Sequence, residues 1–193
     1  MSLECERLHS LVDKVPKCHI RNIDDVHIPG DGIYFITEDG ESYKGFARIV
    51  RMGFNKKKGN LPNKIKEVLW GPSSFRKNMR RAVQKRYKNL KGSEEINAFL
   101  DEYMKQNMKI GFVKIRSSRV RKRMVRKFIK YLECAECYKP SAHWLGKSSS
   151  KLYIRKKGFW HLQNFKRSKK QDPDDIDLEF LFEKIKKLDN YQQ

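Results

Sequence analysis

The sequence has 193 residues, enough for one domain of ordinary size and too few for two independent ones. Hydrophobic residues make up 38% of it and aromatic residues 11%, so the chain can bury a core, which excludes a disordered protein. With 44 Lys and Arg against 23 Asp and Glu, the net charge of +21 predicts a polyanionic partner, and nucleic acid fits best.

The first part of the chain predicts a helix and then a β-hairpin. Apolar residues recur at helical spacing over residues 1–20 until Pro16 ends the pattern. The stretch "GDGIYFITEDGE" alternates in polarity and reaches the turn dipeptide Asp39-Gly40, and "YKGFARIVRMGF" resumes with β-branched and aromatic residues. These two stretches are expected to pair as antiparallel strands.

Three helices are expected next. The segment "LPNKIKEVLWG" has Pro62 near its start and Gly71 just past its end, which is typical of a short helix. In "SSFRKNMRRAVQKRY" the apolar residues repeat every four positions, so one apolar stripe lies on a basic helix. A third helix follows in "SEEINAFLDEYMKQNM", where two acids suit the positive end of the helix dipole.

The remaining chain predicts a strand, a strongly basic helix, an irregular segment and a final helix. "MKIGFVKIR" reads as the strand, and "SSRVRKRMVRKFIKYLEC" as a helix without an acid before Glu133. An aromatic-rich segment over 138–165 is too long for a passive connection. A basic linker and a C-terminal helix finish the chain over 166–193.

Cations of the two basic helices are predicted to contact phosphates, although a solvated helix surface is the usual meaning of a charge run. The predicted nucleic-acid-binding residues are Arg76, Arg80, Arg119, Arg123, Arg126, Lys127 and Lys130.

Several motifs in this order resemble the GIY-YIG nuclease superfamily, and one divergent branch of it most closely. They are Gly32-Ile33-Tyr34, "RIVRMGFN" where the branch has "RIVRVGTH", "SSFRKNMRRAV", and "PSAHWLGKSSSKLYIRKKGFWHLQ". The resemblance spans about residues 28–163 and implies an α+β fold with a three-stranded antiparallel sheet flanked by helices. It implies one domain over 1–193, with an N-terminal extension over 1–21 and a core over 22–165.

The resemblance also implies a site for phosphodiester hydrolysis. It assigns Tyr34 to the first-signature tyrosine, Arg51 to the second-signature tyrosine and Lys64 to a helical arginine, while His143 replaces an asparagine. The superfamily's metal-binding glutamate falls near Arg126, so no metal ligand is predicted, and Mg²⁺ or Mn²⁺ is expected only if the protein is active.

Two functions therefore stay open: a metal-dependent endonuclease acting on DNA, or a module on the same fold that binds DNA, or alternatively RNA, without cleaving it. The Tyr34, Arg51 and Lys64 side chains are expected to converge on one surface cleft in either case.

The tryptophans and cysteines of the second half of the chain are expected to have structural roles. Trp144 and Trp160 are expected to plug the irregular segment into the core rather than to stack on bases. The Cys134/Cys137 pair could join Cys18-His19 around zinc, but a single CxxC is a weak signal.

No apolar run approaches the roughly 18 residues that a membrane span needs. The N-terminus also lacks the apolar region of a signal peptide. An intracellular, cytoplasmic protein with reduced thiols is expected.

Overall fold

The computed structural model describes residues 3–134 and 139–161, together with Phe180 and Glu183. Its elements in chain order are α1 (Leu3–Asp13), β1 (Lys17–His19), η1 (Ile20–Asp25), β2 (Gly32–Tyr43), β3 (Phe46–Phe54), α2 (Leu61–Leu69), α3 (Ser74–Arg86), α4 (Ser93–Asn107), β4 (Met108–Lys114), α5 (Ser118–Cys134), η2 (Leu145–Ser148) and α6 (Leu152–Lys157). The predicted C-terminal helix, Phe180 and Glu183 apart, lies outside the described residues, as does Cys137.

The sheet is antiparallel and has four strands in the order β1-β4-β2-β3. The fold is therefore α+β as expected, but the prediction of three strands was wrong. The additional strand β1 pairs with β4 through Lys17 opposite Gly111. It spans only three residues, too few to show an alternating pattern, and so its sequence gave no strand signal.

The β-hairpin formed by β2 and β3 is confirmed, but its turn is not at Asp39-Gly40. Strand β2 continues until Tyr43, which pairs with Phe46. The chain reverses at Lys44 and Gly45, which have φ angles of 50° and 86°. The residues between Thr37 and Ser42 form an irregular insertion in the ladder, and Gly40 provides its left-handed conformation with a φ of 79°.

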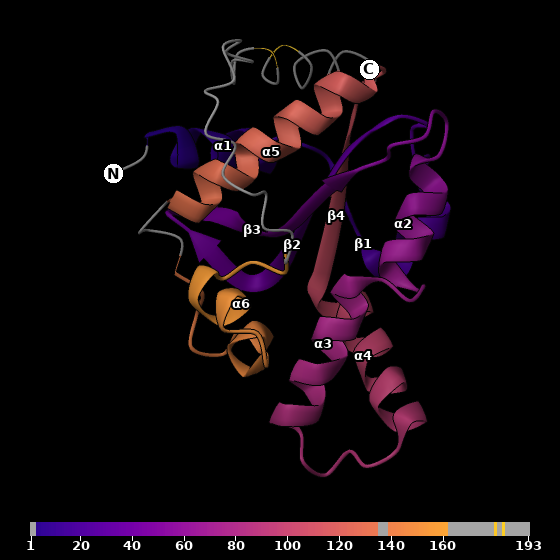
Figure 1. Cartoon of the computed structure of the whole chain (residues 1–193), viewed down its shortest axis with the longest axis vertical. Helices are drawn as coiled ribbons and strands as arrows, with labels where there is room; N and C mark the ends of the chain where they lie inside the picture. Colours follow the sequence, from indigo (N-terminus) through magenta and orange to yellow (C-terminus); the bar gives the residue numbers. More distant parts are fainter. Residues whose placement is uncertain (1–2, 135–138, 162–179, 181–182, 184–193) are drawn as a thin grey trace.

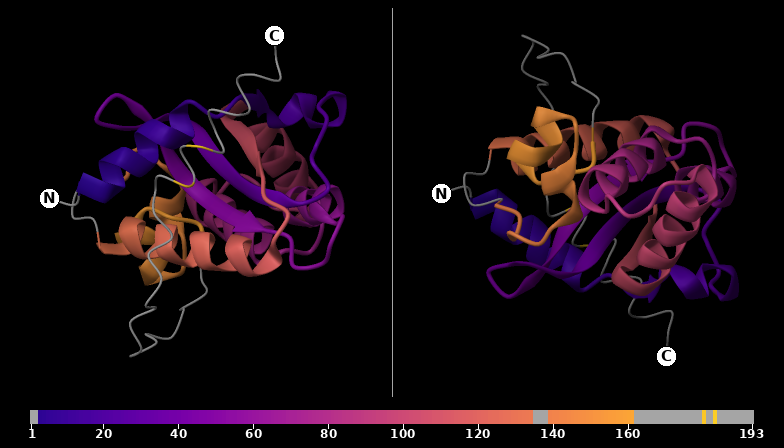
Figure 2. Two further views of the ribbon diagram at one scale, coloured as in Figure 1. Left: turned by 90° about the horizontal axis from the view of Figure 1, so that it is seen from above. Right: turned by 90° about the horizontal axis from the view of Figure 1, so that it is seen from below.

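Helices cover both faces of the sheet (Figure 1). Figure 2 shows α1 and α5 against one face, and α3, α4 and the 139–161 segment against the other. We call these the α5 face and the α3 face. The alternation of β2 divides its side chains accordingly, because Ile33 and Phe35 belong to the cluster beneath α1 and α5, while Tyr34 and Ile36 belong to the other.

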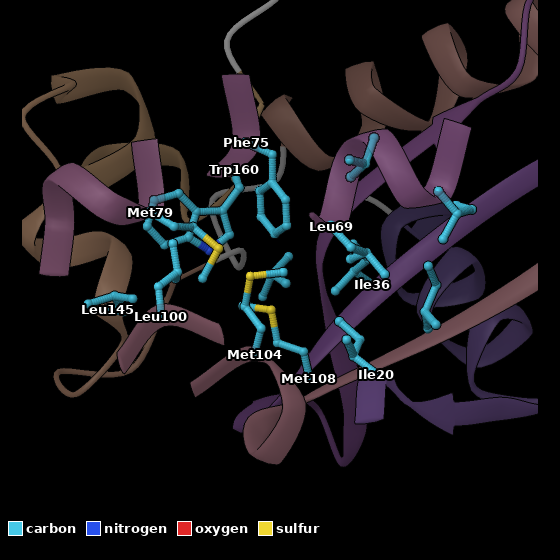
Figure 3. Close-up of a cluster of buried hydrophobic side chains, with 14 of the residues drawn as sticks. Ile20, Ile36, Leu69, Phe75, Met79, Leu100, Met104, Met108, Leu145 and Trp160 are labelled. Atoms are coloured by element: carbon cyan, nitrogen blue, oxygen red, sulfur yellow. The ribbon is translucent and has the colours of Figure 1, made fainter. Parts of the chain in front are cut away.

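The α3 face carries the larger apolar cluster, shown in Figure 3. The predicted stripe of α3 supplies Phe75, Met79 and Val83, all fully buried. Ser73 caps this helix by accepting a hydrogen bond from the Arg76 amide at 3.2 Å. The three expected helices and the expected strand are thus confirmed as α2, α3, α4 and β4, because their hydrophobic periodicity matches the burial that they achieve.

The N-terminal helix is an integral part of the α5-face cluster. Its residues Leu8, Leu11 and Val12 are at most 2% exposed and belong to the same cluster as Ile33. The segment before residue 22 therefore supplies both a core helix and the edge strand β1.

Candidate nucleic-acid interface

Tyr34 lies in the interior of the α3 face and is 1% exposed. Its partner across the ladder is Gly53, the glycine of the "RIVRMGFN" stretch. A Cβ atom at Gly53 would lie only 2.4 Å from the Tyr34 hydroxyl oxygen, so the glycine makes room for the phenol ring. The first and second signatures are thus joined by packing.

Arg51 shares the α3 face with Tyr34 because it pairs with Ile36, two residues after Tyr34 in β2, and a β-bulge follows directly. Ile36 pairs with Arg51 and Thr37 with Ile49, which leaves Val50 as an extra residue in β3. The bulge directs Val50 and Arg51 to the same face. The Arg51 guanidinium lies 4.8 Å from the centre of the Phe75 ring and donates a hydrogen bond to the Trp160 carbonyl at 2.7 Å.

The predicted convergence on a surface cleft is not what the structure shows. Tyr34 and Arg51 share a face but are buried, at 1% and 9% exposure. Lys64, on α2, directs its ammonium group to both carboxylate oxygens of Glu67 at 2.8 Å. The His143 side chain is exposed, and its backbone carbonyl accepts a hydrogen bond from Arg86 at 2.7 Å.

The residues present do not fit the divalent metal that the resemblance implies. The aligned position, Arg126, lies on α5, whose buried residues pack on the face opposite Tyr34 and Arg51. It carries a cation, which repels a metal ion. Among residues 3–134 and 139–161 no group of three or more His, Cys, Asp or Glu side chains is arranged to hold one.

A buried acidic pair that the sequence analysis missed lies beside this region. Glu38 accepts hydrogen bonds from the Tyr103 hydroxyl and, at 3.0 Å, from the Trp144 indole nitrogen. Its burial raises its pKa to about 6. Glu41 forms a buried ion pair with Arg48 and also accepts hydrogen bonds from the Ser141 amide and hydroxyl.

These contacts fasten the 139–161 segment to the sheet. The Arg48 guanidinium lies 4.9 Å from the centre of the Trp144 ring and donates to the Gly158 carbonyl. Trp144 and Trp160 are each 1% exposed, with ring centroids 5.1 Å apart. The prediction that both tryptophans plug the core is confirmed, and neither ring is exposed for stacking on a base.

Two of the arginines of α3 hold the fold together. Arg76 forms an ion pair with Asp101 of α4 and donates to the Leu69 carbonyl at 3.1 Å. Arg80 is half-buried. Arg86 donates to the His143 and Trp144 carbonyls, so it anchors the 139–161 segment. These positions leave α3 with few arginines directed to solvent.

Helix α5 presents a different arrangement. Its apolar residues, including Met124, Phe128 and Ile129, are buried against the sheet and α1. The opposite side, which we call the α5 basic surface, consists of exposed Arg119, Lys122, Arg126 and Lys130 with half-buried Arg123 and Lys127. Arg121 lies in the same cation-rich stretch of sequence, but it is 1% exposed and belongs to the interior.

Arg121 belongs to a network that organises the end of the sheet next to α5. It pairs with the Asp31 carboxylate at 3.1 Å and donates to the carbonyls of Asn55, Ile115 and Arg116. Asn55 donates to the Asp31 carboxylate at 2.8 Å. The pKa of Asp31 is lowered, first by the hydrogen bond from Asn55 and then by the hydrogen bond from the Gly59 amide and by the charge of Arg121.

A pocket of about 510 Å³ opens above this network. We call it the basic pocket. It is lined by Gly30, Asp31, Lys58, Lys114 and Arg116. Three separate segments supply its cations: the loop after β3, the end of β4, and the connection that leads into α5. The pocket therefore adjoins the α5 basic surface.

Comparisons of the chain with protein-family models, curated proteins and solved structures gave no match. None of the helices in the described part of the chain is both long and apolar enough to cross a membrane.

Proposed function

We propose that this protein is a nucleic-acid-binding module on a GIY-YIG-like fold, and that it binds DNA through the α5 basic surface and the adjoining basic pocket. The observation that carries the proposal is the division of α5 into a buried apolar side and an exposed basic side. Cations on one side of a helix can follow a phosphate backbone, and they account for part of the net charge of +21.

Binding rather than cleavage is supported by the position of the implied catalytic residues. The Tyr34 phenol is enclosed by the α3 face, and the Arg51 guanidinium is occupied by Phe75 and Trp160. A base or a phosphate-stabilising group has to reach the scissile phosphate within hydrogen-bond distance. With α5 on the opposite face, DNA bound along α5 meets neither side chain.

The test is the salt dependence of duplex DNA binding by a triple variant, Arg119→Gln/Lys122→Gln/Lys130→Gln. Loss of three phosphate contacts should reduce the slope of log K against log salt by roughly 3, at about 0.9 for each contact. The control variant, Lys85→Gln/Lys88→Gln/Lys105→Gln, removes the same charge from exposed positions at and beyond the ends of α3 and α4. The proposal would be contradicted if both variants lost the same amount of slope, or if the affinity for DNA did not change with salt concentration.

The nuclease alternative is tested on the same preparation. Plasmid DNA incubated with Mg²⁺ or Mn²⁺ should stay intact, because the buried Tyr34 cannot contact it. Metal-dependent nicking that disappears in the Tyr34→Phe protein would overturn this part of the proposal and establish an endonuclease.

A further inference from the structure

The basic pocket differs from the α5 basic surface in shape and in charge density. Lys58, Lys114 and Arg116 line one cavity, whereas the cations of α5 are spread along a convex helix. None of these three side chains has a carboxylate partner within the described part of the chain. Three cations that line one pocket suit an anion with a high charge.

Asp31 does not cancel that charge, although it lines the same pocket. Its carboxylate accepts hydrogen bonds from the Asn55 side chain and from the Gly59 amide at 3.1 Å, and it pairs with the buried Arg121. The Arg121 charge therefore offsets the Asp31 charge within the network. The excess positive charge of the pocket comes from Lys58, Lys114 and Arg116, of which Lys58 also lowers the pKa of Asp31.

The network also fixes the backbone around the pocket. The Gly30 carbonyl accepts the Leu61 amide at 2.9 Å, and the Asp31 carbonyl accepts the Ile115 amide at 3.2 Å. Asn55 joins the two sides by accepting the Gly32 amide at 3.1 Å and donating to the Lys57 carbonyl at 2.6 Å. The segments that carry Lys58, Lys114 and Arg116 are thereby held together before any ligand arrives, which lowers the entropic cost of binding.

From this arrangement we infer that the basic pocket binds the terminal phosphate monoester of a nucleic-acid strand whose backbone lies along the α5 basic surface. A terminal phosphate carries about −1.5 to −2 charges at neutral pH, while an internal phosphodiester carries only one. An internal linkage also has chain on both sides, whereas a strand end can enter a pocket. The inference rests on the proposed function, since it assigns a strand end to the same interface.

The experiment compares three short DNA duplexes of one sequence, with 5′-phosphate ends, 3′-phosphate ends or hydroxyl ends. One phosphorylated form should bind roughly tenfold more tightly than the hydroxyl form, in keeping with charge-assisted hydrogen bonds. The form that is preferred identifies the end. The Lys58→Gln/Lys114→Gln/Arg116→Gln variant should bind all three forms equally, with the salt dependence that the α5 basic surface alone supplies.

The variant that removes Lys85, Lys88 and Lys105 should keep the preference for the phosphorylated end, which separates pocket recognition from a general effect of charge. Equal binding of the three duplexes by the unmodified protein would overturn the inference and leave the proposed function standing. Failure to bind any duplex would overturn the proposed function itself. The first comparison uses only the unmodified protein, so it does not depend on the folding of a variant.

Discussion

At the scale of single residues, the close approach of the Tyr34 ring explains why position 53 is a glycine. Gly53 pairs with Tyr34 across the ladder. A Cβ atom at position 53 would collide with the Tyr34 ring. Gly53→Ala should therefore lower the free energy of unfolding by about 1–3 kcal/mol through overpacking. Urea denaturation measures this loss.

The Tyr34→Ala background provides the control for that substitution. Removal of the ring opens the space that a Cβ at Gly53 would occupy, so Gly53→Ala should cost much less there. Equal costs in both backgrounds would mean that the close approach of Tyr34 to Gly53 is not what requires glycine.

Arg121 and Arg119 look alike in the sequence but should behave differently. Arg121→Met removes the donor to three backbone carbonyls and should lower the free energy of unfolding by about 3 kcal/mol. Arg119 is exposed, so Arg119→Met should change it by less than about 0.5 kcal/mol. Urea denaturation and DNA titration of both variants should show a stability loss only for the first and weaker binding without a stability loss for the second.

At the scale of elements, the sequence predicted what depends on local periodicity and missed what depends on distant partners. The spacing of Phe75, Met79 and Val83 identified α3, because a helix that packs on a sheet repeats its apolar residues every three to four positions. The buried position of Arg121 escaped notice, because its partner Asp31 lies 90 residues earlier in the chain.

Part of the candidate site escaped sequence analysis for the same reason. The bulge brings Val50 to the same face as Arg51, and strict alternation along β3 does not reveal it. Lys58, Lys114 and Arg116 are far apart in sequence, so only the fold brings them to one pocket.

The connection between α3 and the 139–161 segment gives a prediction at this scale. Arg86 donates to the Trp144 carbonyl at 2.9 Å and to the Ser148 hydroxyl at 3.2 Å. Arg86→Ala should weaken the attachment of η2 and speed amide hydrogen exchange over residues 145–149. Lys85→Ala, next to it and exposed, should leave that exchange unchanged, and equal acceleration by both variants would contradict the proposed anchoring role.

At the scale of the whole molecule, two buried histidines dominate the response to acid. Burial lowers the pKa of His9 and His161 from 6.5 to about 4. The folded protein keeps both rings neutral, while the unfolded chain takes up protons as the pH falls below 6.5. The free energy of unfolding should therefore decrease from about pH 6.5 down through pH 4.

Glu38 acts in the opposite direction. Its pKa is raised from 4.5 to about 6, so its contribution to stability is full below pH 4.5 and is lost as the pH rises through 6. Two histidines with larger shifts outweigh one glutamate, and Glu38→Gln should make the loss of stability on acidification steeper. Urea midpoints measured across this range test both statements, and a midpoint that does not fall would contradict the neutral state of the buried histidines.

The attachment of the 139–161 segment also covers part of one edge of the sheet. Strand β3 is outermost, and the Val50 carbonyl accepts a hydrogen bond from the Trp160 amide at 2.8 Å. At the other edge, β1 offers only three residues. Unpaired edges invite strands from other molecules, and a strong net charge opposes such encounters only until polyanions neutralise it. Under the proposed function, this cover on part of β3 should oppose intermolecular β-sheet growth when many copies lie along one nucleic acid with their charge neutralised.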